Sequence, residues 1–208
     1  VWSTEVPPVA PELVVLRIPK QRSLFEYQLS QLARLLPEQT TVLAAGMDKH
    51  LSPHTADILE QYIGPTQRHR GHRKARLFSA IRDQRCVQEY IGTATYHCEA
   101  LNAELCGLAN VFSRDQLDMG TRFLLETLPT LAHAETLIDL ACGNGILGLV
   151  ALKQGVAAKI VFCDESAMAL RSASLNASRI FPQEARNISF HQGDGLLEYC
   201  EKPAQLIL

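Results

Sequence analysis

The segment 137–148 reads LIDLACGNGILG and combines an apolar run, an acidic residue and three glycines. Gly143, Gly145 and Gly148 form a G-x-G-x-x-G pattern, which is typical of a loop that closely approaches a nucleotide. Asp139 lies near the end of the apolar run, where a carboxylate would repel a pyrophosphate and attract a cation. S-adenosylmethionine carries a sulfonium and an amino group, so the pattern favours this cofactor over NAD.

Two further carboxylates follow at the ends of the next expected strands. Asp164, in VFCDES, is placed to accept hydrogen bonds from both hydroxyls of a ribose, as in an NAD site. Asp194, in HQGDGL, is placed to accept from an adenine amino group. Since the carboxyl ends of parallel strands meet at one edge of a sheet, these three acidic strand ends are more specific than the glycine loop alone.

Strand and helix patterns alternate along the first part of the chain. Apolar runs predict strands at 13–18, which is rich in β-branched residues, and at 41–46 and 75–81. Apolar residues at helical spacing predict helices at 21–36 and 52–64, the second with Ser52 as N-cap and Pro53 in its first turn.

The chain changes character between Tyr90 and Val111, where short runs such as TATYHC predict antiparallel strands and a domain boundary. Beyond it we expect a helix at 115–129, helices that begin near Gly145 and Ser166, and the strands TLIDLAC, AKIVFCD and NISFHQ. Alternating strands and helices imply an α/β fold with a parallel, doubly wound sheet.

The motifs IDLACGNG and VFCDES, with NVFSRDQLDMGTRFLLETLP upstream of them, resemble the ribosomal RNA guanine-N2-methyltransferases of the RlmG and RsmC type. YIGPTQRHRGHRKARLF and the long N-terminal portion favour the RlmG side, whose members modify a guanine of large-subunit rRNA. The resemblance implies a Rossmann-like, S-adenosylmethionine-dependent methyltransferase domain at 91–208, and methyl transfer to the exocyclic N2 of guanine. With the strand and helix order, it also predicts a degenerate methyltransferase-like α/β domain at 1–90, in which RIPK stands at the place of a catalytic tetrapeptide.

The resemblance also assigns the cofactor site residue by residue. Ala141 stands where the family usually has glycine. The family positions its target with an Asn-Pro-Pro-Phe tetrapeptide after the fourth strand, and because AQLIL ends the sequence before any such tetrapeptide, we name no catalytic residue and expect no methyl transfer by these 208 residues alone. The residues expected to bind the cofactor are Gly120, Thr121, Asp139, Leu140, Cys142, Gly143, Gly145, Asp164, Glu165, Asp194 and Gly195.

The formal net charge is −2, so contact with RNA would require a local basic patch. The segment RHRGHRKAR at 68–76 is the densest cationic group and contains no acidic residue. A solvated loop is the alternative interpretation of such a charge run, but the resemblance favours ribosomal RNA as its partner. The residues expected to contact RNA are Arg68, Arg70, Arg73, Lys74 and Arg76.

The six cysteines form no C-x-x-C pair, which favours reduced thiols and a cytoplasmic location. No apolar run is long enough to span a membrane. No metal site is expected, because Pro53 and Gly71 interrupt the two closely spaced histidine pairs. Other functions remain open, namely a non-catalytic module that binds RNA or protein, or methylation of another amino or amide nitrogen.

Overall fold

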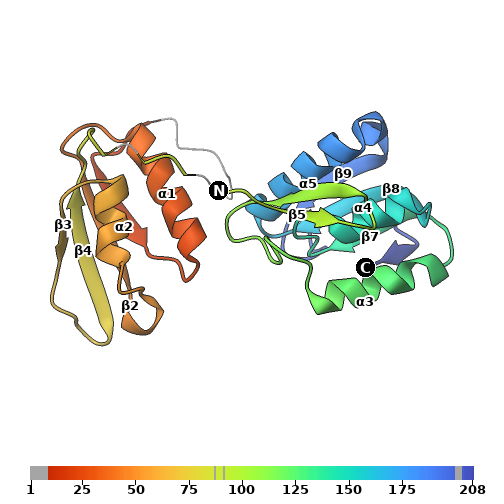
Figure 1. Ribbon diagram of the computed structural model, residues 1–208, viewed down its shortest axis with the longest axis horizontal. Helices are drawn as coiled ribbons and strands as arrows, with labels where there is room; N and C mark the ends of the chain where they lie inside the picture. The colour runs from red at the N-terminus through yellow and green to blue at the C-terminus, as the bar shows by residue number, and fades with distance from the viewer. Residues whose placement is uncertain (1–8, 87, 91, 200–202) are drawn as a thin grey trace. The chain divides into compact units, whose positions relative to one another are not determined.

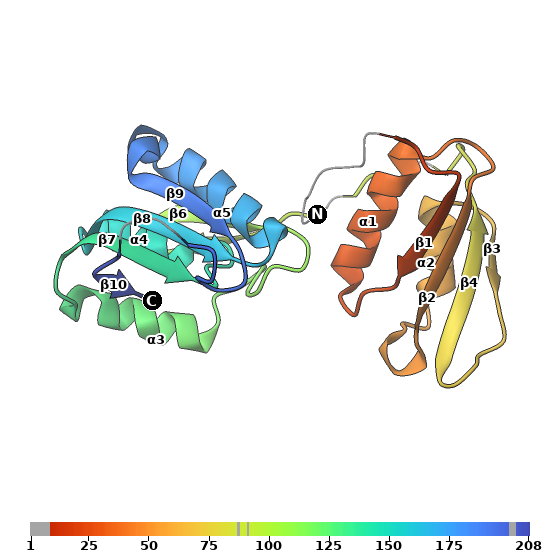
Figure 2. The same cartoon turned by 180° about the vertical axis from the view of Figure 1, so that it is seen from behind.

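The computed structural model describes residues 9–86, 88–90, 92–199 and 203–208 (Figures 1 and 2). The chain divides after Gly92 into an N-terminal and a C-terminal unit, each with its own apolar core. The boundary expected from the sequence lies two residues earlier, at 90/91. Cys200 and the first prolines of the chain, at 7 and 8, lie outside the described residues.

The N-terminal unit contains a four-stranded sheet with the strand order β1-β2-β4-β3. β1 and β2 are parallel, whereas β4 is antiparallel to both of its neighbours. The expected parallel sheet is therefore wrong for this unit, because β3, a short strand that the sequence pattern did not predict, is joined to β4 as a hairpin. The strands are β1 (Leu13–Arg17), β2 (Thr41–Met47), β3 (Thr66–Arg68) and β4 (Ala75–Ile81).

Helices α1 (Arg22–Leu35) and α2 (Thr55–Tyr62) cover one face of this sheet (Figures 1 and 2). Their apolar side chains pack on alternate residues of β2 and β4, as the period of two in a strand requires. The expected N-cap at Ser52 is wrong, since α2 begins only at Thr55. The Ser52 hydroxyl accepts a hydrogen bond from the His54 N–H, and a turn follows the short 3₁₀-helix at Asp48–His50.

The C-terminal unit contains a four-stranded sheet of order β10-β7-β8-β9, and every neighbouring pair is parallel, as expected. Leu140 is paired with Cys163, and Asp164 with Gln192, so the carboxyl ends of three strands meet at one edge. The strands are β7 (Ala134–Leu140), β8 (Ala157–Asp164), β9 (Ile188–Gln192) and β10 (Leu206–Ile207).

Helices begin at the expected places in this unit: α4 (Ile146–Lys153) directly after Gly145, and α5 (Ala167–Ile180) directly after Ser166. The Ser166 hydroxyl caps α5 by accepting the Ala169 N–H. α3 (Met119–Thr127) is shorter than the expected 115–129, because Asp118 caps it at 118. 3₁₀-helices follow at Leu128–Thr130 and Pro182–Asn187.

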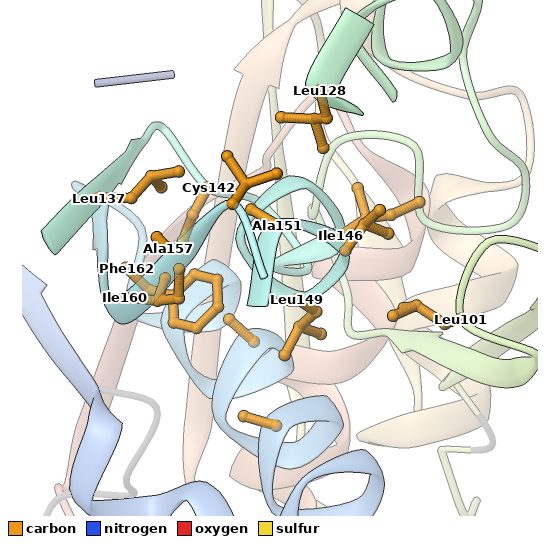
Figure 3. Close-up of a cluster of buried hydrophobic side chains, with 14 of the residues drawn as sticks. Leu101, Leu128, Leu137, Cys142, Ile146, Leu149, Ala151, Ala157, Ile160 and Phe162 are labelled. Atoms are coloured by element: carbon orange, nitrogen blue, oxygen red, sulfur yellow. The ribbon is translucent and has the colours of Figure 1, made fainter. Parts of the chain in front are cut away.

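An antiparallel hairpin, β5 (Ala94–Cys98) and β6 (Ala103–Gly107), confirms the strand prediction between Tyr90 and Val111. The main core lies between α4, α5, the hairpin and one face of the sheet (Figure 3). Its fully buried side chains include Leu105, Leu137, Leu149, Ile160 and Phe162. This packing fixes the positions of the loops that leave β7 and β8.

Candidate functional site

The glycine loop between β7 and α4 contains three residues with left-handed backbone: Ala141 (φ 56°), Gly143 (φ 56°) and Gly145 (φ 84°). A Cβ at Gly145 would lie 3.0 Å from the Cβ of Ala173, so this glycine serves close helix packing. A Cβ at Gly143 would find only the Phe112 carbonyl oxygen, at 3.9 Å, among the described residues. Gly143 therefore leaves an open place at the loop surface, where a ligand could approach the backbone.

Asp139 does not lie open in the loop as the sequence pattern suggested. Its side chain is only 1% exposed, and it accepts a hydrogen bond of 2.9 Å from the N–H of Gly148 in α4. Burial, together with the neighbouring Asp164 carboxylate, raises the pKa of Asp139 to about 7. The carboxylate thus anchors the first turn of α4 beneath the loop, and its contact with a cofactor stays a prediction.

Asp164 joins the loops that follow β7 and β8. Its Oδ2 accepts a hydrogen bond of 3.0 Å from the Gly143 N–H, and its Oδ1 accepts one of 2.8 Å from the Ser166 N–H. The side chain is half-buried at the carboxyl end of β8. Asp164 and Gly143, 21 residues apart in the sequence, are therefore direct partners.

A cavity of about 560 Å³ opens at the ends of β8 and β9. It brings together two expected site residues, Glu165 and Asp194, with Gly195 beside it in the chain. Glu198 adds a third carboxylate, so the cavity favours a cationic ligand over a phosphate. The sequence pattern did not predict the remaining lining residues, which are Gln192, Gly193, Leu197 and Glu198.

Gly120 and Thr121 lie at the start of α3, and their N–H groups donate to Asp118 Oδ1 at 2.9 and 3.3 Å. The side-chain hydrogen bond of Thr121, and these N–H groups, lower the pKa of Asp118. Neither residue lines the cavity at β9. Their expected role near the methionine end of a cofactor stays a prediction.

Cys142 and Leu140 flank the loop in different ways. The Cys142 thiol lies in the main core (Figure 3), where burial raises its pKa far above the usual range. Such a thiol is a poor nucleophile, so the packing interpretation fits it better than a catalytic one. Leu140 is the last residue of β7, where it is 37% exposed and directly precedes the glycine loop.

Three polar residues that the sequence pattern did not single out brace the glycine loop. Asn144 donates to the Tyr96 hydroxyl of β5 at 3.0 Å. Asn176, fully buried in α5, donates to the carbonyls of Asn144 and Cys106, and accepts the Cys106 N–H, each at 2.9 Å. The available signal was an amide in line with the apolar residues of the helix at 167–180, because a buried amide needs hydrogen-bond partners.

The basic segment 68–76 contains the turn of the β3–β4 hairpin in the N-terminal unit, from the last residue of β3 to the second residue of β4. Arg68, Arg70, Arg73 and Lys74 are exposed. Arg76 is different, since its Nε donates to Asp48 Oδ1 at 2.9 Å and its side chain is 23% exposed. The lack of an acidic residue in the local sequence thus did not mean that the segment is unpaired.

The described residues contain no cluster of three or more histidine, cysteine or acidic side chains that could hold a metal ion. A search of the same residues for a helix long and apolar enough to cross a membrane found none.

Two family models match the chain. Residues 1–84 match the RLMG N-terminal domain, and residues 102–208 match the methyltransferase small domain. The ribosomal RNA large subunit methyltransferase G of Alcanivorax borkumensis is 40% identical over 94% of this chain and 49% of its own length. That of Yersinia enterocolitica is 35% identical over 99% of the chain and 52% of its own length. The chain therefore spans about half the length of these curated relatives.

A solved structure has the same fold over almost all of the chain. It is a T. thermophilus 16S rRNA N2 G1207 methyltransferase (RsmC) in complex with AdoMet and guanosine, with a TM-score of 0.76 and 19% identity. The match covers 95% of this chain and 54% of that one, and it shows the same fold. The family model over residues 102–208 identifies the C-terminal unit as a Rossmann-like methyltransferase domain. With an RLMG N-terminal domain followed by a methyltransferase small domain, the chain belongs to the RlmG family of ribosomal RNA large subunit methyltransferases.

Proposed function

We propose that the chain binds S-adenosylmethionine in its C-terminal unit and serves an enzyme that transfers the methyl group to the exocyclic N2 of a guanine in large-subunit ribosomal RNA. One observation carries this proposal. Gly143, in the open glycine loop, donates a hydrogen bond to Asp164 at the carboxyl ends of β7 and β8. The relatives named as ribosomal RNA large subunit methyltransferase G support the substrate class.

The residues at this edge fit the cofactor. Gly143 leaves room at the loop surface, and we assign Asp164 to the ribose hydroxyls and Asp194, which lines the cavity at β8 and β9, to the adenine amino group. The bound cofactor would supply an electrophilic methyl group on a sulfonium. The protein's part is to orient this group and to hold the guanine amino group in line with it, which is positioning catalysis. The carboxylates at the edge would keep RNA phosphates away from the cofactor.

The first test is the choice of cofactor. Isothermal titration calorimetry of the 208-residue chain should show binding of S-adenosylmethionine or S-adenosylhomocysteine and none of NAD. The carboxylates near the loop attract the cationic groups of the former and repel the pyrophosphate of the latter. Binding of NAD without binding of S-adenosylmethionine would refute the proposal.

Asp164→Ala should weaken S-adenosylmethionine binding by about 1.5–3 kcal/mol, the scale of a lost hydrogen bond to a charged group. Part of this loss comes from the loop, because the Gly143 N–H loses its acceptor. Asp164→Asn, which keeps one carbonyl oxygen, should lose less. The matched control is Asp57→Ala, an exposed carboxylate of the N-terminal unit, and equal affinities of Asp164→Ala and Asp57→Ala would remove Asp164 from the site.

The basic hairpin favours RNA contact in the N-terminal unit. A triple variant, Arg70→Glu, Arg73→Glu and Lys74→Glu, should bind single-stranded RNA more weakly. For each lost phosphate contact, the slope of log K against log salt should become shallower by about 0.7. The control reverses Arg122, Lys153 and Arg186, three exposed cations of the C-terminal unit. If filter binding over a salt series gives the triple variant the slope of the unaltered chain, 68–76 is a solvated loop.

Two further assignments belong to this proposal. The order of strands and helices, with RIPK starting at the last residue of β1, supports a degenerate methyltransferase-like domain in the N-terminal unit. The five described cysteines are free thiols, which supports a reducing, cytoplasmic location near the ribosome.

A further inference from the structure

The N-terminal unit has a cavity of about 500 Å³, distinct from the glycine loop, between the β3–β4 hairpin and the start of α2. Two arginines and one carboxylate line it, from Arg68, Arg76 and Asp48. Its apolar lining includes Leu51 and Phe78. The cavity therefore has a positively charged wall next to an apolar wall, a combination that suits a ligand with an anionic group and an apolar or aromatic group.

The register of the hairpin explains why both arginines reach the same cavity. Arg68 is paired with Phe78, and Arg76 precedes Phe78 by two residues on β4. Residues paired across strands, or two apart within a strand, share one face of a sheet. Phe78 is buried under the helices, so the arginines lie on the helix-covered face, next to the turn that precedes Thr55.

The cavity holds an uncompensated positive charge. Asp48 neutralises Arg76 through the 2.9 Å contact, which also fixes the guanidinium plane. The Arg68 side chain is exposed and has no hydrogen bond or ion pair with the residues that the structure describes. Lys49 follows Asp48 directly. Desolvation, followed by the charges of Lys20, Lys49 and Arg17, lowers the pKa of the neighbouring His50. The surroundings therefore attract an anion.

The hairpin turn next to the cavity is held in a costly conformation. Arg73 (φ 48°) and Lys74 (φ 63°) both adopt left-handed backbone, a type of turn that usually contains asparagine and glycine. The Lys74 carbonyl accepts the Asp48 N–H at 2.8 Å, so the turn is tied to the wall of the cavity. Strained cationic residues at such a place point to a functional constraint.

We propose that this cavity binds one unpaired nucleotide of the RNA substrate, with its phosphate on Arg68 and its base between the Arg76 guanidinium and Leu51. Arginine matches phosphate geometry and stacks on planar groups, and a site of a few hundred cubic ångströms accommodates a nucleotide. This inference rests on the proposed action on RNA and adds where the N-terminal unit holds it.

The first experiment compares two arginines that carry the same charge. Arg68 lines the cavity, whereas Arg34 is exposed in α1 of the same unit and does not line it. Binding of a fluorescein-labelled single-stranded 12-nucleotide RNA to the full chain is followed by anisotropy. Arg68→Ala should weaken binding about tenfold, the loss expected for one charge-assisted phosphate contact, and Arg34→Ala about twofold or less. Equal losses would overturn the proposal.

The second experiment fills the cavity without changing charge. Ala56, at its edge in α2, is replaced by phenylalanine, and the exposed Ala132 of the C-terminal unit receives the same change as the control. Ala56→Phe should weaken RNA binding and abolish competition by guanosine 5′-monophosphate, and because the phosphate contact of Arg68 is lost with the nucleotide, the salt slope should become shallower by about 0.7. Thermal unfolding checks that each variant is folded. If Ala56→Phe, folded, binds RNA and the monophosphate as the Ala132→Phe control does, the cavity is not the site.

A titration of each preparation with S-adenosylmethionine separates the two proposals. Failure of the cavity proposal would leave cofactor binding intact, whereas failure of the proposed function would show as absent cofactor binding, whatever the RNA data give.

Discussion

Asp139→Asn is expected to stabilise the ligand-free protein at pH 8 and, at the same time, to weaken its binding of S-adenosylmethionine. In the folded chain burial raises the pKa of Asp139 from its usual 3.8 to about 7. Between these values the folded state holds more protons than the unfolded state, so stability falls as pH rises through this window. At pH 8 the full penalty, on the order of 2–4 kcal/mol, is present, and asparagine removes most of it.

The stability measurement is urea unfolding at pH 5 and pH 8. The difference between Asp139→Asn and the unaltered chain should be large at pH 8 and small at pH 5. Asparagine keeps an oxygen that can accept the Gly148 N–H, so α4 stays anchored. Asp194→Asn is the control, because Asp194 is exposed and its replacement should leave stability unchanged at both pH values. If Asp139→Asn and the unaltered chain show the same pH dependence of stability, Asp139 is not the buried group whose ionisation destabilises the fold.

The affinity for the cofactor should rise with pH, whereas the stability of the ligand-free chain falls. A cationic ligand near the loop stabilises the ionised form of Asp139, so the affinity of the unaltered chain should rise from pH 6 to pH 8. Asp139→Asn should bind about tenfold more weakly at pH 8, the loss expected for an interaction with a charged group. Calorimetry at the two pH values measures this. An affinity of Asp139→Asn equal to that of the unaltered chain would leave Asp139 a structural residue only.

Local patterns predicted most of the elements, because each depends on residues close together in the chain. The predicted apolar runs became β1, β2, β4 and β8, and Gly145 and Ser166 directly precede the helices expected there. The start of α2 was wrong because the Ser52 hydroxyl bonds inside a turn instead of capping a helix. β3 has only three residues, and it is a strand because β4 pairs with it.

The sequence predicted individual site residues at strand ends, but it did not predict the contacts between them. The sequence indicated Asp164 and Gly143 separately, but their hydrogen bond depends on the register between β7 and β8. The contact of Asp48 with Arg76 was not predicted either, because these residues are 28 apart in the sequence and meet through the register between β2 and β4. The burial of Asp139 follows from the packing of α4 on the sheet, so a pattern that places it at a strand end cannot distinguish a ligand contact from a helix anchor.

Gly148→Ala is expected to lower the free energy of unfolding of the C-terminal unit by about 2–3 kcal/mol, although alanine is the better helix former by about 1 kcal/mol. A Cβ at Gly148 would lie 2.5 Å from Phe162 Cε1 and 2.8 Å from Ile160 Cγ2. Phe162 and Ile160 are almost completely buried in β8, so α4 must move away from the sheet. Urea unfolding measures the loss.

Gly120→Ala is the matched control, since Gly120 is also helical but exposed. Its nearest neighbour would be Asp118 Oδ1, at 3.2 Å, on a side chain that can move. This change should alter stability by less than about 1 kcal/mol. A loss in Gly148→Ala no larger than in Gly120→Ala would contradict the close packing.

A double-mutant cycle identifies the partner of Gly148. Phe162→Leu alone should destabilise the core, but combined with Gly148→Ala it should cost less than the sum of the two changes, because the shorter side chain makes room for the added methyl group. Strict additivity would mean that the clash is with another group. The same result would explain the third glycine of the 143–148 pattern. It is required for packing α4 on β8, and only Gly143, the glycine with open space at its Cβ position, remains free to approach a ligand.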